Sequence, residues 1–188
     1  KPDVTLALVD ARAPFGNGYL MPRGPLRDRP ETLAECDVVI MTRANLVPDI
    51  EAVEREVRAV CGSAALLRAE MQVVGFREIA GKAIALVDGC AVAVATAIGE
   101  PNQFIASLER CGIKVLFWRA WRDHAPLPEE ALVALADEAK ARGALFVVVT
   151  EKDAVKLRPG LALSLPLIVA EGRWQLIGKE SLDIFIEG

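Results

Sequence analysis

The chain has 188 residues, of which 53% are apolar and 26% charged, and its formal net charge is −4. This composition is typical of a folded globular protein and argues against an intrinsically disordered one. The 22 basic residues are scattered along an acidic chain, which argues against a nucleic-acid partner. Four cysteines without a C-x-x-C pair, beside a single histidine, argue against a zinc site and are typical of reduced thiols in a cytosolic protein.

Two features of the sequence bear on processing and on membrane insertion. The sequence begins Lys-Pro-Asp, without Met or a signal peptide, and we expect further chain upstream. The most apolar stretch, Ala83 to Ile98, is interrupted by Asp88-Gly89 and is too short for a transmembrane helix.

The first third of the chain predicts two buried strands, at residues Val4 to Val9 and Asp37 to Met41. Between them, Ala13 to Pro30 holds several Gly and Pro residues, which predict a structured or functional loop rather than a regular element. Apolar residues at helical spacing predict an amphipathic helix over Ile50 to Val60.

The remainder of the chain predicts a bridging hairpin and then a strand–helix alternation. Strands are expected at Met71 to Phe76 and Lys82 to Val87, on either side of a turn. The alternation that follows comprises strand Ala91 to Thr96, helix Asn102 to Cys111, strand Ile113 to Trp118, helix Pro128 to Arg142, strand Leu145 to Thr150, a short helix Glu151 to Leu157 and strand Leu165 to Ala170. This order predicts a parallel, three-layer α/β lobe.

The loop between the first two strands carries an extended motif. It reads Phe15-Gly16-Asn17-Gly18, then Leu20-Met21-Pro22, then Gly24-Pro25-Leu26-Arg27-Asp28, after a strand that ends in Asp10-Ala11. This passage resembles the F-G-N-G-x-L-L-P-x-G-P-L-R-E signature of the tetraacyldisaccharide 4'-kinase family of lipid A biosynthesis. Asp28 stands where the family has Glu, which keeps the carboxylate and shortens its reach.

Three further passages match the same family in the same order. The segment Ile98 to Phe104 resembles G-I-G-N-P-x-x-F, with a Glu in place of the family's Asn. The segment Asp123 to Leu127 resembles D-H-H-x-[YF], with Ala125 in place of the second His and Leu127 in place of the aromatic residue. The segment Thr150 to Lys156 matches T-E-K-D-A-V-K without a change. The resemblance therefore covers nearly the whole chain.

The resemblance implies an α/β fold of three layers, α/β/α, around a mostly parallel sheet. It places the remnant of a P-loop kinase domain at residues 1–68, bridging strands at residues 69–90 and a smaller C-terminal α/β lobe at residues 91–188. No G-x-x-x-x-G-K-[ST] occurs in the 188 residues, and in the family this phosphate-binding loop lies upstream of the matched region. We therefore expect a truncated kinase that is inactive alone.

Asp10 is the candidate metal ligand. It ends an apolar strand, and strand ends deliver side chains to the ligand-bearing edge of an open α/β sheet. A carboxylate there resembles one that holds Mg²⁺. The alternative is an acidic turn residue without a ligand.

Three residues of the loop motif are candidates for contact with the reactants. Arg27 can form paired hydrogen bonds to phosphate, and the carboxylate of Asp28 can contact a metal or a sugar hydroxyl. We assign Arg27 and Asn17 to substrate or phosphate binding and Asp28 to catalysis. The alternative for Arg27 and Asp28 is an exposed ion pair.

His124, the single histidine, follows Asp123, which could fix the tautomer of the imidazole. The resemblance implies a histidine near the reacting centre, so both residues are assigned to catalysis; the absence of the second His leaves a two-histidine role open. Thr150 and Asp153 have the spacing of an N-capping box. Lys152 between them is assigned to phosphate binding, with a solvated side chain as the alternative.

The segment Trp118-Arg119-Ala120-Trp121-Arg122 places two indoles and two cations together. This composition suits a lipid headgroup or acyl-chain interface. Core packing at a strand end is the alternative.

The resemblance implies transfer of the γ-phosphate of ATP, with Mg²⁺, to the 4'-hydroxyl of tetraacyldisaccharide 1-phosphate. The implied partners are ATP and the lipid A disaccharide precursor, with the membrane surface reached through that substrate. The implied location is peripheral, at the cytoplasmic face of the bacterial inner membrane. The departures at Glu100, Ala125 and Leu127 leave a second hypothesis: a non-catalytic α/β binding module derived from the kinase, recognising a glycolipid or a nucleotide.

Overall fold

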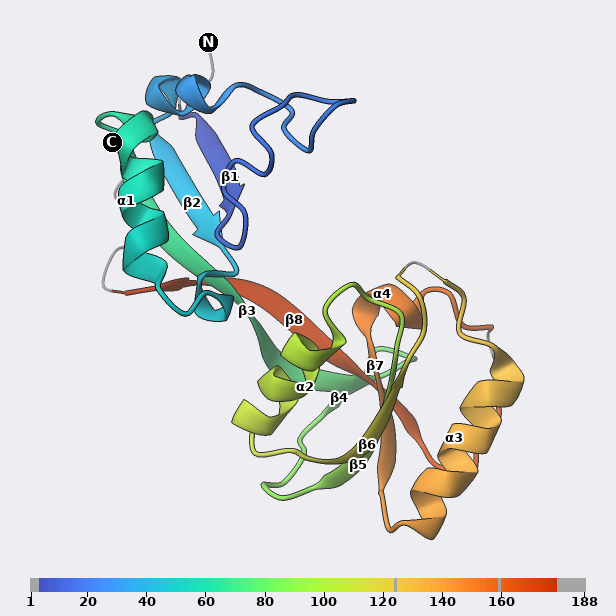
Figure 1. The fold of residues 1–188 in the computed structure, drawn as a ribbon. Coiled ribbons are helices and arrows are strands. Elements are labelled where there is room, and N and C mark those ends of the chain that lie inside the picture. Colours follow the sequence, from blue (N-terminus) through green and yellow to red (C-terminus); the bar gives the residue numbers. More distant parts are fainter. Residues whose placement is uncertain (1–3, 124, 159, 179–188) are drawn as a thin grey trace. The chain divides into compact units, whose positions relative to one another are not determined.

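The computed structural model describes residues 4–123, 125–158 and 160–178 (Figure 1). The strands are β1 (Leu6–Asp10), β2 (Val38–Thr42), β3 (Ala65–Glu78), β4 (Ala83–Ile84), β5 (Ala91–Thr96), β6 (Lys114–Ala120), β7 (Phe146–Thr150) and β8 (Leu167–Ile177). The α-helices are α1 (Ile50–Cys61), α2 (Pro101–Arg110), α3 (Glu129–Ala141) and α4 (Glu151–Ala154), and two 3-10 helices occupy Pro30–Glu35 and Ala44–Leu46.

The strands follow the order β1-β2-β3-β8-β7-β5-β6, and β4 pairs with β3. The described chain divides into two compact units, residues 4–71 with 174–178 and residues 72–173. Strands β3 and β8 each contribute residues to both units. The predicted boundaries at residues 68 and 90 stay a prediction.

In the first unit, β1, β2 and β3 are parallel, with Asp10 opposite Thr42 at their carboxyl ends. Asp49 caps the start of helix α1, and its side chain accepts a hydrogen bond from the Ala52 amide at 2.9 Å. Its apolar stripe packs on one face of these strands, where Val39, Met41 and Val57 are fully buried. The other face carries a smaller buried cluster, Val38, Ile40, Leu67 and Ala69, and Leu8 beside it is exposed.

In the second unit, β5 lies between β6 and β7, and all three strands are parallel. Successive side chains of a strand point to opposite faces, so Val92 and Val94 pack with α2 while Ala93 and Ala95 pack with α3. All four residues are fully buried because helices cover both faces. The expected mostly parallel α/β fold of three layers is confirmed.

Three predicted strands differ in extent from the observed ones. The strand expected at Leu165 to Ala170 corresponds to β8, which continues seven residues further, to Ile177. The strand expected at Met71 to Phe76 is part of β3, which begins six residues earlier, at Ala65. The strand expected at Lys82 to Val87 is reduced to the two residues of β4. Within the described ranges, no helix is long and apolar enough to cross a membrane.

Candidate functional site

The carboxyl end of β1 holds a charged cluster around Asp10. The Arg12 guanidinium donates to both carboxylate oxygens of Asp10, at 3.1 and 2.8 Å, and Arg43 donates to Oδ2 at 2.7 Å. The hydrogen bond from Arg12 is the largest cause that lowers the pKa of Asp10, and the charge of Arg43 adds to it. Asp10 is therefore held as a carboxylate at the sheet edge, where α/β proteins bind ligands.

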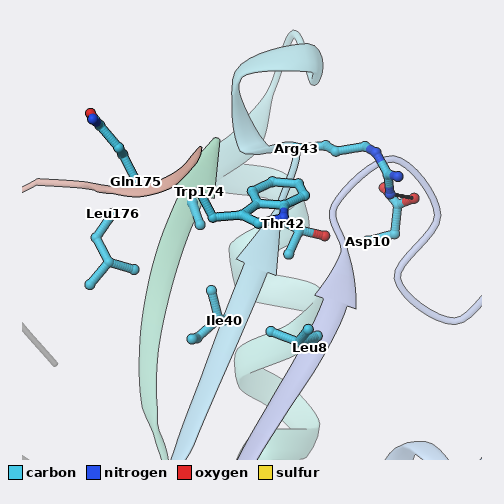
Figure 2. Close-up of a pocket in the computed structure, with 9 residues that line it drawn as sticks. Leu8, Asp10, Ile40, Thr42, Arg43, Trp174, Gln175 and Leu176 are labelled. Atoms are coloured by element: carbon cyan, nitrogen blue, oxygen red, sulfur yellow. Dashed lines mark hydrogen bonds and ion pairs between the residues drawn. The ribbon is translucent and has the colours of Figure 1, made fainter. Parts of the chain in front are cut away.

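A pocket of about 500 Å³ opens beside this cluster (Figure 2). The charged and hydroxyl side chains of Asp10, Arg43 and Thr42 lie at one end of the lining, and the apolar side chains of Leu8 and Ile40 project from β1 and β2. The remaining lining residues are Ala69, Trp174, Gln175 and Leu176. A pocket with a charged end and an apolar floor suits a ligand that is itself amphipathic.

The Asp10 cluster offers a single carboxylate to Mg²⁺. No group of three or more His, Cys, Asp or Glu side chains with metal-binding geometry occurs among the described residues. Mg²⁺ in kinases is commonly held by one or two carboxylates together with substrate phosphates and water, so the single carboxylate of Asp10 fits this mode. The described residues do not form a site that coordinates a metal through protein side chains alone.

The charge state of Asp10 makes a testable prediction. Because its folded-state pKa lies below the ordinary value of 3.8, its ion pairs contribute stability above that pH and lose it as the pH falls through the folded-state pKa. We expect the difference in unfolding free energy between the wild type and Asp10→Asn to shrink as the pH is lowered from 7 to 3. Urea denaturation at several pH values measures this difference. A constant difference across this range would contradict the role of the ionised carboxylate.

The loop of residues 13–30 is held together by its own motif residues. Asn17 uses both ends of its amide inside the loop: Nδ2 donates to the Arg23 carbonyl at 3.2 Å, and Oδ1 accepts from the Tyr19 amide at 3.1 Å. A Cβ on Gly24 would overlap the Tyr19 carbonyl and Asn17 Oδ1, and one on Gly16 would overlap Pro25. Much of the F-G-N-G and G-P pattern is therefore explained by packing within the loop.

Gly24→Ala tests this packing. The new methyl group has no room beside the Tyr19 carbonyl, which is backbone and cannot rotate away, so we expect the loop to open. Limited proteolysis should cleave residues 16–25 about tenfold faster in the variant than in the wild type. Gly18→Ala is the control, because no atom lies within 4 Å of a Cβ there although its φ of 77° also strains an alanine. Equal cleavage of Gly24→Ala and wild type would contradict the packing.

The side chains of Arg27 and Asp28, near the end of this loop, are exposed. They follow the bridge between Leu20 and Leu26 that closes the loop. Their exposure leaves them accessible to a ligand, and their roles stay predictions.

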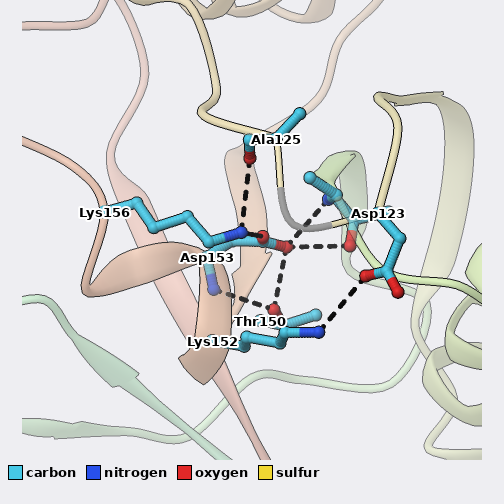
Figure 3. Close-up of polar contacts among 8 residues, drawn as sticks. Asp123, Ala125, Thr150, Lys152, Asp153 and Lys156 are labelled. Carbon is cyan, nitrogen blue, oxygen red and sulfur yellow. Dashed lines mark hydrogen bonds and ion pairs between the residues drawn. The ribbon is translucent and has the colours of Figure 1, made fainter.

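In the second unit, the buried carboxylate of Asp153 links the Thr150 to Lys156 motif to the end of β5 (Figure 3). Asp153 is fully buried, and its Oδ2 accepts hydrogen bonds from Thr96 Oγ1, the Ala97 amide and Thr150 Oγ1 at 2.9, 3.0 and 2.8 Å. Its Oδ1 accepts from Lys156 Nζ at 3.1 Å. The predicted helix cap is present, because Thr150 Oγ1 accepts from the Asp153 amide at 3.1 Å.

Lys156 extends this network to the Asp-His segment. Its Nζ also donates to the Ala125 carbonyl at 3.3 Å, as Figure 3 shows. Leu127, which stands in place of the family's aromatic residue, is buried in the core beneath α3. The two departures from the family pattern thus have structural roles here, one through its backbone and one through packing.

Asp123 and Lys152, both predicted site residues, lie together at the surface of the second unit. Lys152 Nζ donates to Asp123 Oδ1 at 3.2 Å. The other carboxylate oxygen of Asp123 faces Gly99, where an added Cβ would lie 3.4 Å from it. Lys152 thus pairs with a carboxylate of the chain itself, and its role in phosphate binding stays a prediction. His124 lies outside the described residues, so its predicted role is untested.

The Trp118 to Arg122 segment has features of both interpretations, core packing and lipid contact. Trp121 packs partly against the core that α3 covers. Trp118 is exposed, and Arg119 pairs with Glu138 of α3. The lipid contact proposed for this segment stays a prediction.

Sequence reasoning found Asp10 but missed both of its cationic partners. Arg12 could have been predicted, because an arginine two residues after a strand-end aspartate can donate a hydrogen bond back to its carboxylate. Arg43 lies one residue beyond Thr42, which pairs with Asp10 in the parallel register. Pairing the two predicted strands would have placed Arg43 beside Asp10.

A family model of tetraacyldisaccharide-1-P 4'-kinase (LpxK) matches residues 1–187. The tetraacyldisaccharide 4'-kinase of Anaeromyxobacter dehalogenans (strain 2CP-C) is 35% identical over 171 residues, covering 85% of this chain and 43% of that protein. The tetraacyldisaccharide 4'-kinase of Rhodopseudomonas palustris (strain BisB5) is 32% identical over 178 residues, covering 90% of this chain and 49% of that protein.

A crystal structure of LpxK from Aquifex aeolicus, described as an "apo" form in complex with ATP, matches with a TM-score of 0.60 at 18% identity. It covers 100% of this chain and 52% of that chain, and at this identity it supports the fold alone. The chain spans about half the length of the relatives it matches. The family match over nearly the whole sequence, with relatives above 30% identity, shows that the chain belongs to the tetraacyldisaccharide 4'-kinase family.

Proposed function

We propose that this chain is part of an ATP-dependent kinase that phosphorylates the 4'-hydroxyl of tetraacyldisaccharide 1-phosphate in lipid A biosynthesis. The observation that carries the proposal is the Asp10, Arg12 and Arg43 cluster at the carboxyl ends of β1 and β2. Phosphoryl transfer needs positioned reactants and charges that offset those on the transferred group, and this cluster supplies one carboxylate and two guanidinium groups. The family membership supports the substrate class.

Several residues of the first unit have roles in this proposal. Asp10 would hold Mg²⁺, which would offset negative charge on the ATP phosphates. Arg12 and Arg43 fix the orientation of the Asp10 carboxylate through their hydrogen bonds. Arg27 binds a phosphate group, and Asn17 acts with it by keeping the loop in shape. Asp28 supplies a carboxylate to the acceptor sugar.

Three residues of the second unit also have roles in this proposal. His124 acts near the acceptor hydroxyl, with Asp123 beside it in sequence. Lys152 holds Asp123 through its ion pair and adds positive charge for a substrate phosphate. Asp123 also lies beside Gly99 of the Gly-Glu-Pro turn. We place the whole protein peripherally at the cytoplasmic face of the inner membrane, reached through its lipid substrate.

The test uses protein expressed from the complete open reading frame that encodes this chain. Incubated with ATP labelled at the γ-phosphate, Mg²⁺ and tetraacyldisaccharide 1-phosphate in detergent, it should form labelled bisphosphate lipid, and EDTA should abolish the product. The 188-residue chain alone should give no turnover, because it contains no P-loop sequence.

A second candidate is a non-catalytic binding module derived from the kinase, favoured by Ala125 standing in place of a histidine. A folded product of the complete frame that binds the lipid or ATP but forms no labelled bisphosphate would support the module and overturn the kinase.

A further inference from the structure

The loop of residues 16–31 exposes three consecutive large apolar side chains. Tyr19, Leu20 and Met21 are 46%, 39% and 65% exposed, and Pro22 after them is exposed too. In the remainder of the described chain, exposed large apolar side chains do not occur three in a row. A consecutive run of this kind is unfavourable in water and marks an interaction site. We call Tyr19, Leu20, Met21 and Pro22 the loop tip.

The loop tip is held in this exposed arrangement by hydrogen bonds beneath it. The Met21 amide donates to the Leu26 carbonyl at 2.8 Å, and the Gly24 amide donates to the Leu20 carbonyl at 3.0 Å. With the close packing of Gly24 against Tyr19 and Asn17 already described, these bonds fix the turn. The backbone of the turn is therefore fixed with these apolar side chains on its outer side, where a partner can bury them.

Arginines surround the loop tip. The Arg23 guanidinium lies 3.8 Å from the centre of the Tyr19 ring, and Arg27 and Arg29 are exposed. Residues 16–31 hold these three arginines and two acidic residues, Asp28 and Glu31, for a net charge of +1, whereas the whole chain carries −4. The loop is thus a locally basic region of an acidic protein, and its charge is complementary to an anionic surface.

A concavity of about 480 Å³ lies between the loop tip and these charges. Arg23 and Arg29 both line it, together with Tyr19, Met21 and one carboxylate, Glu31. A guanidinium group can donate two parallel hydrogen bonds to phosphate oxygens. Two guanidinium groups beside an apolar tip therefore suit a lipid whose phosphate binds the arginines and whose acyl chains contact the apolar side chains. Aromatic and aliphatic residues flanked by basic ones are the composition of segments that lie in the membrane interface.

We propose that the loop of residues 16–31 is a membrane-binding surface that inserts its tip into an anionic phospholipid bilayer and binds lipid phosphates through Arg23 and Arg29. This contact is made by the protein with the bilayer itself and does not require the disaccharide substrate or ATP. It uses the loop tip, Arg23 and Arg29, whereas the phosphoryl-transfer roles proposed above belong to Asp10 and to other residues of the same loop, Arg27 among them.

Vesicle co-sedimentation of the 188-residue chain tests the proposal, with phosphatidylglycerol–phosphatidylcholine vesicles compared with phosphatidylcholine alone. The chain should bind the anionic vesicles at least tenfold more tightly, and 0.5 M NaCl should weaken that binding. The double variant Leu20→Ser with Met21→Ser should weaken it about tenfold, because two apolar side chains no longer enter the interface. Arg23→Gln with Arg29→Gln should weaken it by a similar factor and reduce its salt dependence.

Matched controls separate this surface from general effects. Val87→Ser removes another highly exposed apolar side chain, and Arg55→Gln removes an exposed arginine on α1, so both should bind as the wild type does. Circular dichroism verifies that each variant is folded. Equal binding to both vesicle types, or unchanged binding of the serine variant, would overturn the proposal. So would self-association in size-exclusion chromatography that the serine variant loses, since the tip would then bind protein. Because no ATP is present, none of these outcomes bears on the kinase proposal.

Discussion

Asp153→Ala should lower the unfolding free energy by about 3–5 kcal/mol, which is a large part of the stability of a domain of this size. The substitution removes the acceptor of four described hydrogen bonds and leaves Lys156 without its buried carboxylate. Breaking a buried ion pair by deleting one partner costs far more than breaking an exposed pair, because the remaining charge and donors are left unsatisfied.

The control for Asp153 lies in the neighbouring ion pair. Asp123→Asn removes a carboxylate that is exposed and paired with Lys152, so its cost should stay below about 1 kcal/mol. Urea denaturation followed by circular dichroism measures both. Hydrogen exchange at the Ala97 amide, which donates to Asp153, should quicken only in the Asp153 variant. Equal effects of the two substitutions would contradict the distinction between buried and exposed carboxylates.

Asp10→Asn should lower kcat for lipid phosphorylation roughly 10²- to 10³-fold in protein from the complete open reading frame. The amide keeps the shape of the side chain but loses the charge that holds Mg²⁺ and that Arg12 and Arg43 surround. Its effect on folding at pH 7 should be small, within about 1 kcal/mol, because Asp10 is partly exposed.

Glu56→Gln is the control for this activity measurement. It neutralises an exposed carboxylate on α1 of the same unit, away from the strand ends, and should leave kcat within about twofold. The rate is measured at saturating ATP and over a range of Mg²⁺ concentrations. If Asp10→Asn retained the wild-type kcat and Mg²⁺ dependence, the role given to the Asp10 cluster would be wrong.

The local parts of both sites could be predicted from the sequence. An apolar run ended by an acid placed Asp10 at a strand end, and the Thr-x-x-Asp spacing predicted the cap on α4. The rest depended on contacts distant in sequence. Asp153 bonds to Thr96, 57 positions away, and no local pattern indicates which buried donors a carboxylate will find.

The strand β3 was predicted too short for a similar reason. Its first residues, Ala65 to Glu70, are mostly good helix formers, so their local preference hid the strand. Parallel pairing with β2 over Val38 to Thr42 decides the structure there, since it buries Leu66 and Leu67 on opposite faces. The tight packing of Gly24 was also hidden, because the motif gave its residues but not which atoms they approach.

The path of β8 has a consequence for the order of folding during synthesis. Although β1, β2, β3 and α1 lie within the first 78 residues, Leu176 packs on their second buried cluster. A ribosome must therefore translate the whole intervening segment before that contact can form. Until then, apolar side chains of the early strands remain uncovered. A chain stopped before Trp174 should therefore be a target for chaperones and proteases.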